Sequence, residues 1–114
     1  MSKVSIETSL KKNNNEELNT KTLGILQEEQ IKYKESEIIS IFDIKKETLK
    51  RKSDDYNLTI DFKNELVKTE YLDIKIRIID KQIEQNKIKI KYEVIDTKDI
   101  FEYEIIWREL WKKK

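Results

Sequence analysis

The residue types available for chemistry in this chain are tyrosines, carboxylates and lysines, because the sequence contains neither histidine nor cysteine. Without these two types the chain cannot build a Ser-His-Asp triad, a Cys-His dyad or a common zinc site. A single glycine also excludes the glycine-rich loops that bind nucleotide phosphates. We therefore expect no catalytic residue, no metal ligand, no cofactor and no enzymatic activity.

Pairs of adjacent carboxylates are the remaining candidates for acid–base catalysis or cation binding. They occur at Glu16-Glu17, Glu28-Glu29 and Asp54-Asp55, each in a predicted loop or turn. Acidic residues in loops are usually solvated, and adjacent residues of a strand point to opposite faces. We interpret these pairs as surface charges, and a small hydrolase-like enzyme is the last of our three functional hypotheses.

Aromatic side chains are the candidate ligand-binding residues. Tyr92, Tyr103 and Trp107 share the predicted inner face of one hairpin with Phe101, and Tyr56 is added to them from an earlier strand. In a ligand-binding barrel such residues would line a cavity, with the phenol groups orienting an apolar guest. A barrel of about eight strands can also be filled by its own side chains. We expect a filled interior, with a cavity as the alternative.

The densest basic stretch suggests a second function, binding to RNA. It comprises Lys45, Lys46, Lys50, Arg51 and Lys52, with Tyr33 or Tyr56 as possible platforms for base stacking. However, Asp54 and Asp55 follow at once, and the formal net charge of the whole chain is +1. We therefore interpret the stretch as the charged outer face of a hairpin and do not expect nucleic acid as a partner.

Length and composition predict one domain over residues 1–114. Hydrophobic residues make up 37% of the chain and charged residues 41%, which leaves enough apolar side chains for one core. The N-terminus lacks the apolar stretch of a signal peptide, and no apolar run is long enough to span a bilayer. We expect a cytoplasmic protein without a membrane partner, present as a monomer or weak homodimer.

Two segments near the C-terminus alternate between apolar and charged residues, which predicts a half-buried hairpin. They cover residues 87–94 and 100–108, separated by a turn at 96–99. A turn at that place pairs Val94 with Phe101 and Tyr92 with Tyr103, so that all four lie on one face. It also sets Glu93 unfavourably opposite Glu102.

An earlier hairpin follows the same logic. Residues 56–63 alternate, a tight turn is predicted at Asn64-Glu65, and Ile60 is then expected to pair with Thr69. The apolar residues of the next segment fall at odd positions up to Tyr71, at even positions from Leu72 to Ile78, and at odd positions again from Ile79. Each change predicts a bend or bulge in the strand.

The first half of the chain is less regular, and it predicts short strands at residues 3–10, 18–27, 31–33, 39–44 and 48–52, with a polar loop at 11–17. Gly24 lies inside one of these strands, which indicates a bulge or a close backbone contact. The predicted fold is therefore all-β, an antiparallel up-and-down barrel of about eight strands. The side chains expected to point inward are Leu58, Ile60, Phe62, Ile74, Ile76, Ile88, Ile90, Tyr92, Val94, Phe101, Tyr103 and Ile105.

The middle of the chain resembles the YwiB-like family of uncharacterised bacterial β-barrels, which is related in fold to the lipocalin-type calycins. The resemblance is carried by ETLKRKSDDYNLTIDF at 47–62, YKESE at 33–37 and KIKIKYEVID at 87–96, with Thr22-Leu23-Gly24 matching a Thr-x-Gly strand. The chain departs from the family pattern after Ser36, where a longer loop is cut short, and near Tyr71, where a Thr-Pro-Tyr-Gly turn is missing. The resemblance implies a calycin-like barrel and no activity. If the loop and the turn form a ligand mouth in the family, their loss implies a loss of the site.

The leading hypothesis is thus a non-enzymatic binding domain for a small molecule or a protein partner. The RNA-associated factor and the small enzyme are the alternatives.

Overall fold

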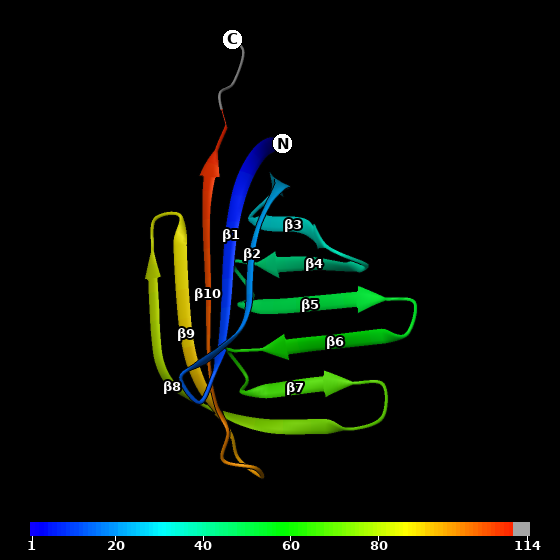
Figure 1. The fold of residues 1–114 in the computed structure, drawn as a ribbon, viewed down its shortest axis with the longest axis vertical. Helices are drawn as coiled ribbons and strands as arrows, with labels where there is room; N and C mark the ends of the chain where they lie inside the picture. Colours follow the sequence, from blue (N-terminus) through cyan, green and yellow to red (C-terminus); the bar gives the residue numbers. More distant parts are fainter. Residues whose placement is uncertain (111–114) are drawn as a thin grey trace.

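Ten antiparallel strands close into a barrel in the computed structural model, which describes residues 1–110 apart from the side chain of Tyr56 (Figure 1). Each strand pairs with the next along the chain, and the last returns to the first. The strands are β1 (Ser2–Lys12), β2 (Asn15–Gln27), β3 (Gln30–Glu35), β4 (Ile38–Asp43), β5 (Thr48–Ser53), β6 (Tyr56–Asp61), β7 (Leu66–Thr69), β8 (Asp73–Glu84), β9 (Lys87–Val94) and β10 (Ile100–Glu109). The predicted all-β up-and-down barrel is confirmed. No helix that is long and apolar enough to cross a membrane occurs in the part of the chain that the structure describes.

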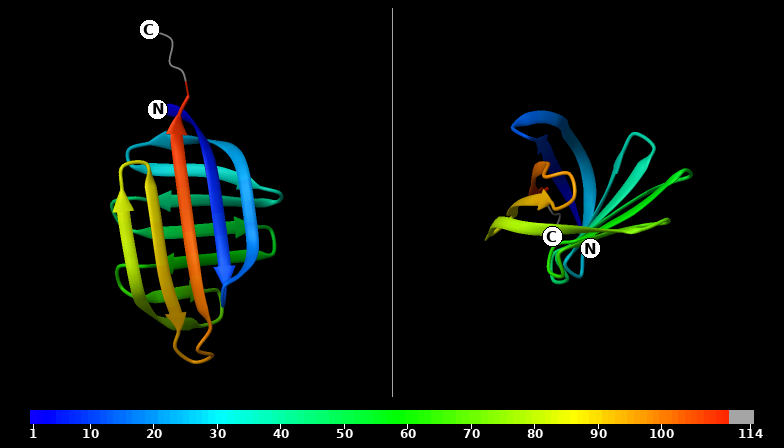
Figure 2. Two further views of the ribbon diagram at one scale, coloured as in Figure 1. Left: turned by 60° about the vertical axis from the view of Figure 1, so that its left-hand side comes forward. Right: turned by 90° about the horizontal axis from the view of Figure 1, so that it is seen from below.

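The barrel is flattened into two layers whose strands cross at a steep angle (Figures 1 and 2). One layer holds β1, β9 and β10, and the other holds β3 to β7. The long strands β2 and β8 belong to both layers. β8 pairs with β7 through residues 73–75 and with β9 from Ile76 onward. Its register shifts between Ile78 and Asp80, which confirms the irregularity predicted there.

Gly24 lies where β2 passes from one layer to the other. It pairs with Val4 of β1 on one side and with Tyr33 of β3 on the other. A Cβ atom at this position would overlap the Ile6 side chain and the Lys32 carbonyl oxygen. The close backbone contact expected for Gly24 is therefore present, and only glycine fits here without displacing a neighbour.

The twelve side chains predicted to point inward all belong to the core or pack against it. Both predicted registers are nevertheless wrong by two residues. Tyr103 pairs with Ile90 rather than Tyr92, and Ile60 pairs with Val67 rather than Thr69. Each turn is centred one residue earlier than expected and closes with a residue of positive φ, Lys98 or Glu65. A shift of two residues changes partners but not faces, so the predicted core survives.

The corrected register improves the charges on the outer face. Glu102 lies opposite Lys91 instead of Glu93, and its carboxylate is 3.8 Å from the Lys89 ammonium. Glu93 instead pairs with Arg77 at 2.8 Å. Opposite charges across neighbouring strands stabilise a sheet modestly, so the predicted repulsion between the two glutamates is removed.

Two connections are sharper than predicted, and the first of them divides one expected strand into two, which brings the barrel closer to its ten strands than the predicted number of about eight. The change of parity after Tyr71 is not a bulge but a turn between β7 and β8, closed by hydrogen bonds between Thr69 and Leu72. The predicted polar loop at 11–17 is mostly strand, with only Asn13 and Asn14 between β1 and β2. The alternation of apolar and polar residues therefore predicted which side chains point inward, but it did not predict where the strands end.

Because neighbouring strands run in opposite directions, alternate turns lie at the same end of the barrel. We call the end that carries the turns at 13–14, 36–37, 54–55, 70–72 and 95–99 the open end. The closed end carries the turns at 28–29, 44–47, 62–65 and 85–86, together with the start of β1 and the finish of β10.

Candidate functional site

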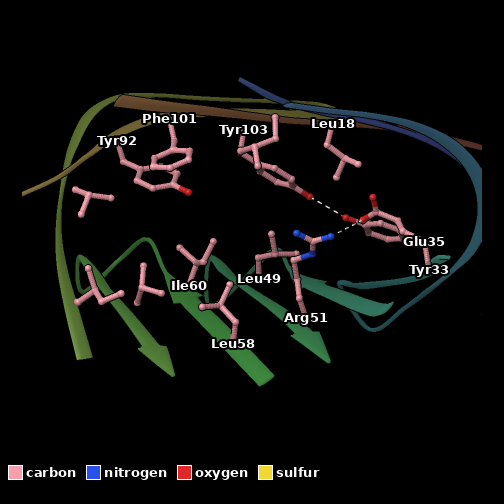
Figure 3. Close-up of a pocket in the computed structure, with 14 residues that line it drawn as sticks. Leu18, Tyr33, Glu35, Leu49, Arg51, Leu58, Ile60, Tyr92, Phe101 and Tyr103 are labelled. Carbon is pink, nitrogen blue, oxygen red and sulfur yellow. Dashed lines mark hydrogen bonds and ion pairs between the residues drawn. The ribbon is translucent and has the colours of Figure 1, made fainter. Parts of the chain in front are cut away.

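A cavity of about 280 Å³ lies inside the barrel, toward the open end (Figure 3). Fourteen residues line it, of which nine have hydrocarbon side chains, three are tyrosines, and two, Glu35 and Arg51, carry charge. Tyr92, Phe101 and Tyr103 form one wall, and Leu49, Leu58 and Ile60 form the facing wall. The cavity thus separates the two layers of the barrel.

The interior is filled at the closed end. Phe42, Phe62 and Ile105 are each at most 1% exposed, and the Phe42 and Phe62 ring centroids lie 6.4 Å apart. The ring of Tyr103 stacks on both phenylalanines, at 6.1 and 6.3 Å, and forms the boundary between the filled part and the cavity. The expectation of a filled interior is therefore correct for the closed end and wrong for the open end.

A polar cluster occupies one side of the cavity. The Arg51 guanidinium lies 3.8 Å from the Glu35 carboxylate (Figure 3), and the hydroxyl of Thr20 donates to the other carboxylate oxygen at 2.9 Å. The hydroxyl of Ser40 contributes a longer contact to Glu35 at 3.4 Å. Both charged side chains are largely shielded from solvent, with exposed fractions of 17% for Arg51 and 7% for Glu35. The carboxylate is therefore held mainly by groups of the barrel itself.

Strand register places this cluster inside the barrel. Tyr33, Ser40 and Arg51 lie side by side on β3, β4 and β5. Glu35 has the same inward parity as Tyr33 because it is two residues along β3. Ser40 is completely buried.

One donor of the cluster has no acceptor among the described residues. The Nε atom of Arg51 is buried, and no protein group accepts its hydrogen bond. Buried N–H groups are nearly always hydrogen-bonded in folded proteins, because an unpaired one costs about 1–3 kcal/mol. The cavity is therefore lined by a side chain that has an unpaired donor beside an ion pair.

Two tyrosine hydroxyls meet next to this donor. The Tyr33 and Tyr103 oxygens lie 3.1 Å apart, and either can donate to the other. Burial raises the pKa of Tyr33 to about 12 and raises the pKa of Tyr103 well above its ordinary value. Both phenols are consequently neutral near pH 7 and keep their protons for hydrogen bonding.

The structure brings together two of the four aromatic residues proposed as ligand contacts. Tyr92 and Tyr103 line the cavity, and the Tyr92 ring stacks on Phe101 with centroids 5.4 Å apart. Trp107 is buried but does not line the cavity. The side chain of Tyr56 lies outside the described residues.

The basic stretch is divided between three places. Lys50 and Lys52 face outward on β5, whereas Arg51 between them points into the cavity. Lys45 and Lys46 lie in the turn at the closed end. Tyr33 is 3% exposed inside the barrel and presents no open face for stacking a base.

Sequence reasoning missed Arg51 and Glu35 as parts of one site. The available signal was the alternation within their own short strands. Arg51 is two residues from Leu49, and Glu35 is two and four residues from Tyr33 and Ile31, so each faces the same way as these core residues. We grouped Arg51 with the lysines beside it in the chain instead, although adjacent residues of a strand face opposite ways.

The carboxylate pairs do not converge on a site. Glu28-Glu29 and Asp54-Asp55 form turns at opposite ends of the barrel, while Glu16 and Glu17 belong to β2 rather than to a loop. Within residues 1–110, no three acidic side chains are grouped so that they could hold a metal ion.

Comparison of the chain with protein families, curated proteins and solved structures gave no match.

Proposed function

We propose that this protein is a non-enzymatic binding domain that holds a small, mostly apolar molecule in the cavity of its barrel. The observation that carries the proposal is the cavity at the open end, with its hydrocarbon walls and its single cluster of polar groups. Ligand sites of proteins typically combine a largely apolar lining with a few convergent polar groups that fix orientation.

The size and lining of the cavity favour a small guest. Its volume of about 280 Å³ is near the lower limit of ligand pockets, which span about 300–1,000 Å³. Transfer of apolar surface from water to such walls contributes about 25 cal/mol for each Å² removed from water. An apolar body thus supplies affinity, and the polar cluster supplies orientation.

The open end also offers an apolar rim near the cavity. Tyr71 and Leu72 in the turn between β7 and β8 are 90% and 58% exposed, and Ile95 in the turn between β9 and β10 is 43% exposed. Apolar side chains in this position would favour the approach of an apolar guest.

We extend the proposal to the YwiB-like resemblance and its calycin-type barrel. The two connections that depart from that family's pattern, after Ser36 and near Tyr71, correspond to turns at the open end. On this interpretation the family's mouth is shortened here while a cavity behind it is retained.

The proposal can be tested with a neutral fluorescent probe, N-phenyl-1-naphthylamine, added to the full chain. We expect its fluorescence to rise on binding, and we expect Leu58→Trp to abolish the rise, because the larger side chain fills the cavity. Leu23→Trp is the matched control, since Leu23 is 60% exposed on the outer face of β2. Equal binding by the parent and Leu58→Trp, with both folded by circular dichroism, would contradict the proposal.

Native mass spectrometry of protein purified gently from its own host would then identify the guest. A retained small molecule would support the proposal. Nucleic acid or a stoichiometric protein in its place would instead favour the RNA-associated factor or a protein-binding rim.

A further inference from the structure

We infer that the natural ligand is uncharged and carries one carbonyl-type hydrogen-bond acceptor, as an amide, ester or ketone does, on a small apolar body. This inference rests on the proposed function, because it names the ligand class of the same cavity. It excludes a carboxylate, which is the head group that a buried arginine in an apolar cavity would first suggest.

The free donor of Arg51 calls for an acceptor. Its Nε atom is buried without a partner among the described residues, at the side of the cavity where the Tyr33 and Tyr103 hydroxyls meet (Figure 3). A carbonyl oxygen at this side of the cavity accepts from Nε once the Arg51 side chain turns that atom toward the cavity, and it relieves the cost of an unpaired donor. A pure hydrocarbon leaves that donor unpaired and is the poorer ligand.

The charge of Arg51 is already balanced. The Glu35 carboxylate lies 3.8 Å from the guanidinium, and it is fixed in place by the hydroxyls of Thr20 and Ser40. A ligand carboxylate would set two negative charges against one positive charge in a cavity with apolar walls. The desolvation of an uncompensated charge costs several kcal/mol in such an environment. A neutral acceptor avoids this cost.

The turns around the open end oppose anions as well. They carry six carboxylates, those of Glu37, Asp54, Asp55, Glu70, Asp96 and Asp99. Lys98 is the one basic residue in the same turns, and Lys12, directly before the first of them, lies 3.9 Å from Asp99, so the acidic residues remain in excess. A mouth of predominantly one sign repels ligands of that sign on approach.

The remaining walls of the cavity limit the shape and size of the apolar part of the ligand. The stacked rings of Tyr92 and Phe101 give one flat surface, and Leu58 lies on the facing strand. The cavity volume of about 280 Å³ corresponds to about nine water molecules at about 30 Å³ each. A chain of several carbons with one amide group fits this space, so octanamide is a suitable probe.

The test compares octanamide with octanoate, which has nearly the same shape but is an anion near neutral pH. Isothermal titration calorimetry of the parent protein is expected to give an affinity for octanamide at least about ten-fold higher than for octanoate, a difference of about 1.4 kcal/mol. This comparison needs no variant. Equal or tighter binding of octanoate would overturn the inference.

Glu35→Gln should change the preference. The substitution keeps the shape of the side chain and leaves the Arg51 charge unbalanced, so we expect the affinity for octanoate to rise at least about ten-fold. Glu93→Gln is the matched control: it makes the same change in net charge at the outer-face pair with Arg77 and should leave both affinities unchanged. An octanoate affinity that fails to rise in folded Glu35→Gln would also overturn the inference.

The experiment distinguishes a wrong ligand class from a wrong proposed function. If octanoate displaces N-phenyl-1-naphthylamine from the parent protein and octanamide does not, the cavity binds small molecules but not the class inferred here. If neither compound nor the naphthylamine probe binds, the proposed function fails and the inference fails with it.

Discussion

The closed and open ends of this barrel are built from the same alternation of residues but have opposite interiors. At the closed end Phe42, Phe62 and Ile105 meet in the middle and exclude solvent. At the open end the inward positions hold leucines, tyrosines and the Arg51–Glu35 pair around a cavity. The difference teaches that alternation fixes the direction of a side chain, whereas its size and that of the residue facing it decide whether the space is filled.

The cavity lies where two charged side chains replace apolar ones. A buried ion pair with hydroxyl partners stabilises less than well-packed hydrocarbon of similar volume. The open end is therefore less tightly packed than the closed end and holds a polar cluster with an unpaired donor. We interpret this exchange as a sign of binding, because functional sites are where folded proteins depart from optimal packing.

The largest effect is expected from Phe42→Ala at the closed end. Phe42 is fully buried and packs against Phe62 and Tyr103, so removal of its ring leaves a cavity among side chains that cannot collapse. We expect the free energy of unfolding to fall by about 3–5 kcal/mol. Urea denaturation followed by circular dichroism measures this change.

Leu58→Ala at the open end is the counterpart of that substitution. Leu58 is partly buried and already faces the cavity, so its truncation enlarges an existing space. The cost should be about 1 kcal/mol, less than the roughly 2.4 kcal/mol of three fully buried carbon groups, because Leu58 is only partly buried. Equal losses for Phe42→Ala and Leu58→Ala would break the distinction between a filled and a hollow end.

The ion pair gives the next largest effect. Arg51→Leu leaves Glu35 without its counter-charge, so we expect a loss of about 2–3 kcal/mol. Replacing both Arg51 and Glu35 with leucine should restore the stability of the parent or exceed it, because hydrocarbon then fills the open end. A double variant as unstable as Arg51→Leu would show that the pair is needed for folding and would weaken the case for a ligand role.

Most of the fold could be predicted from the sequence, because residues 56–108 alternate strongly enough to fix which side chains enter the core. The exact partners could not be predicted, since the turns contain no glycine or proline to mark them. Glu65 and Lys98 adopt positive φ, which is uncommon for glutamate and lysine and could not be predicted from their residue types. The connection at 70–72 was missed for the same reason, and the strand count was too low.

The candidate site could be predicted only in part. Tyr92 and Tyr103 were found because they lie in the most regular hairpin. Arg51 and Glu35 were not, because β3 and β5 are only six residues long and each carries charged residues on its outer face and one on its inner face. The cavity itself depends on the distance between two layers, which no local pattern contains.

The contributions of two turn carboxylates to stability can be compared, that of Asp43 at the closed end and that of Asp99 at the open end. At the closed end, burial acts to raise the pKa of Asp43, but hydrogen bonds from the Lys46 backbone N–H, at 2.8 Å, and from Gln30 outweigh it and lower the pKa below its ordinary value. A carboxylate with a lowered pKa stabilises the fold above the pKa of the unfolded chain. This contribution is lost as the pH falls through the folded pKa.

We therefore expect Asp43→Asn to lose about 1 kcal/mol near neutral pH, to begin converging with the parent below about pH 4, and to converge fully only below the lowered pKa of folded Asp43. Thermal unfolding across this pH range is the measurement. Asp99→Asn at the open end should have a smaller effect, because the Asp99 side chain is more exposed than that of Asp43. The same gap between parent and Asp43→Asn at every pH would show that the charge of Asp43 is not what stabilises the turn.

The smallest effect is expected from Glu29→Gly in the turn between β2 and β3, and it is a gain. Glu28 and Glu29 both have positive φ, 51° and 67°, in a two-residue turn of the closed end, where Asn-Gly is the preferred pair. A left-handed conformation costs an L-residue about 1–2 kcal/mol, and glycine removes that cost while adding about 0.4–1 kcal/mol of unfolded-state entropy. The net gain should be about 0.5–1 kcal/mol, seen as a higher urea midpoint with an unchanged slope. Asn14→Gly in the corresponding turn of the open end should gain less, because asparagine tolerates φ of 69° better than glutamate tolerates 67°. A larger gain for Asn14→Gly would mean that the strain lies in the open end, beside the cavity, and not in the closed end.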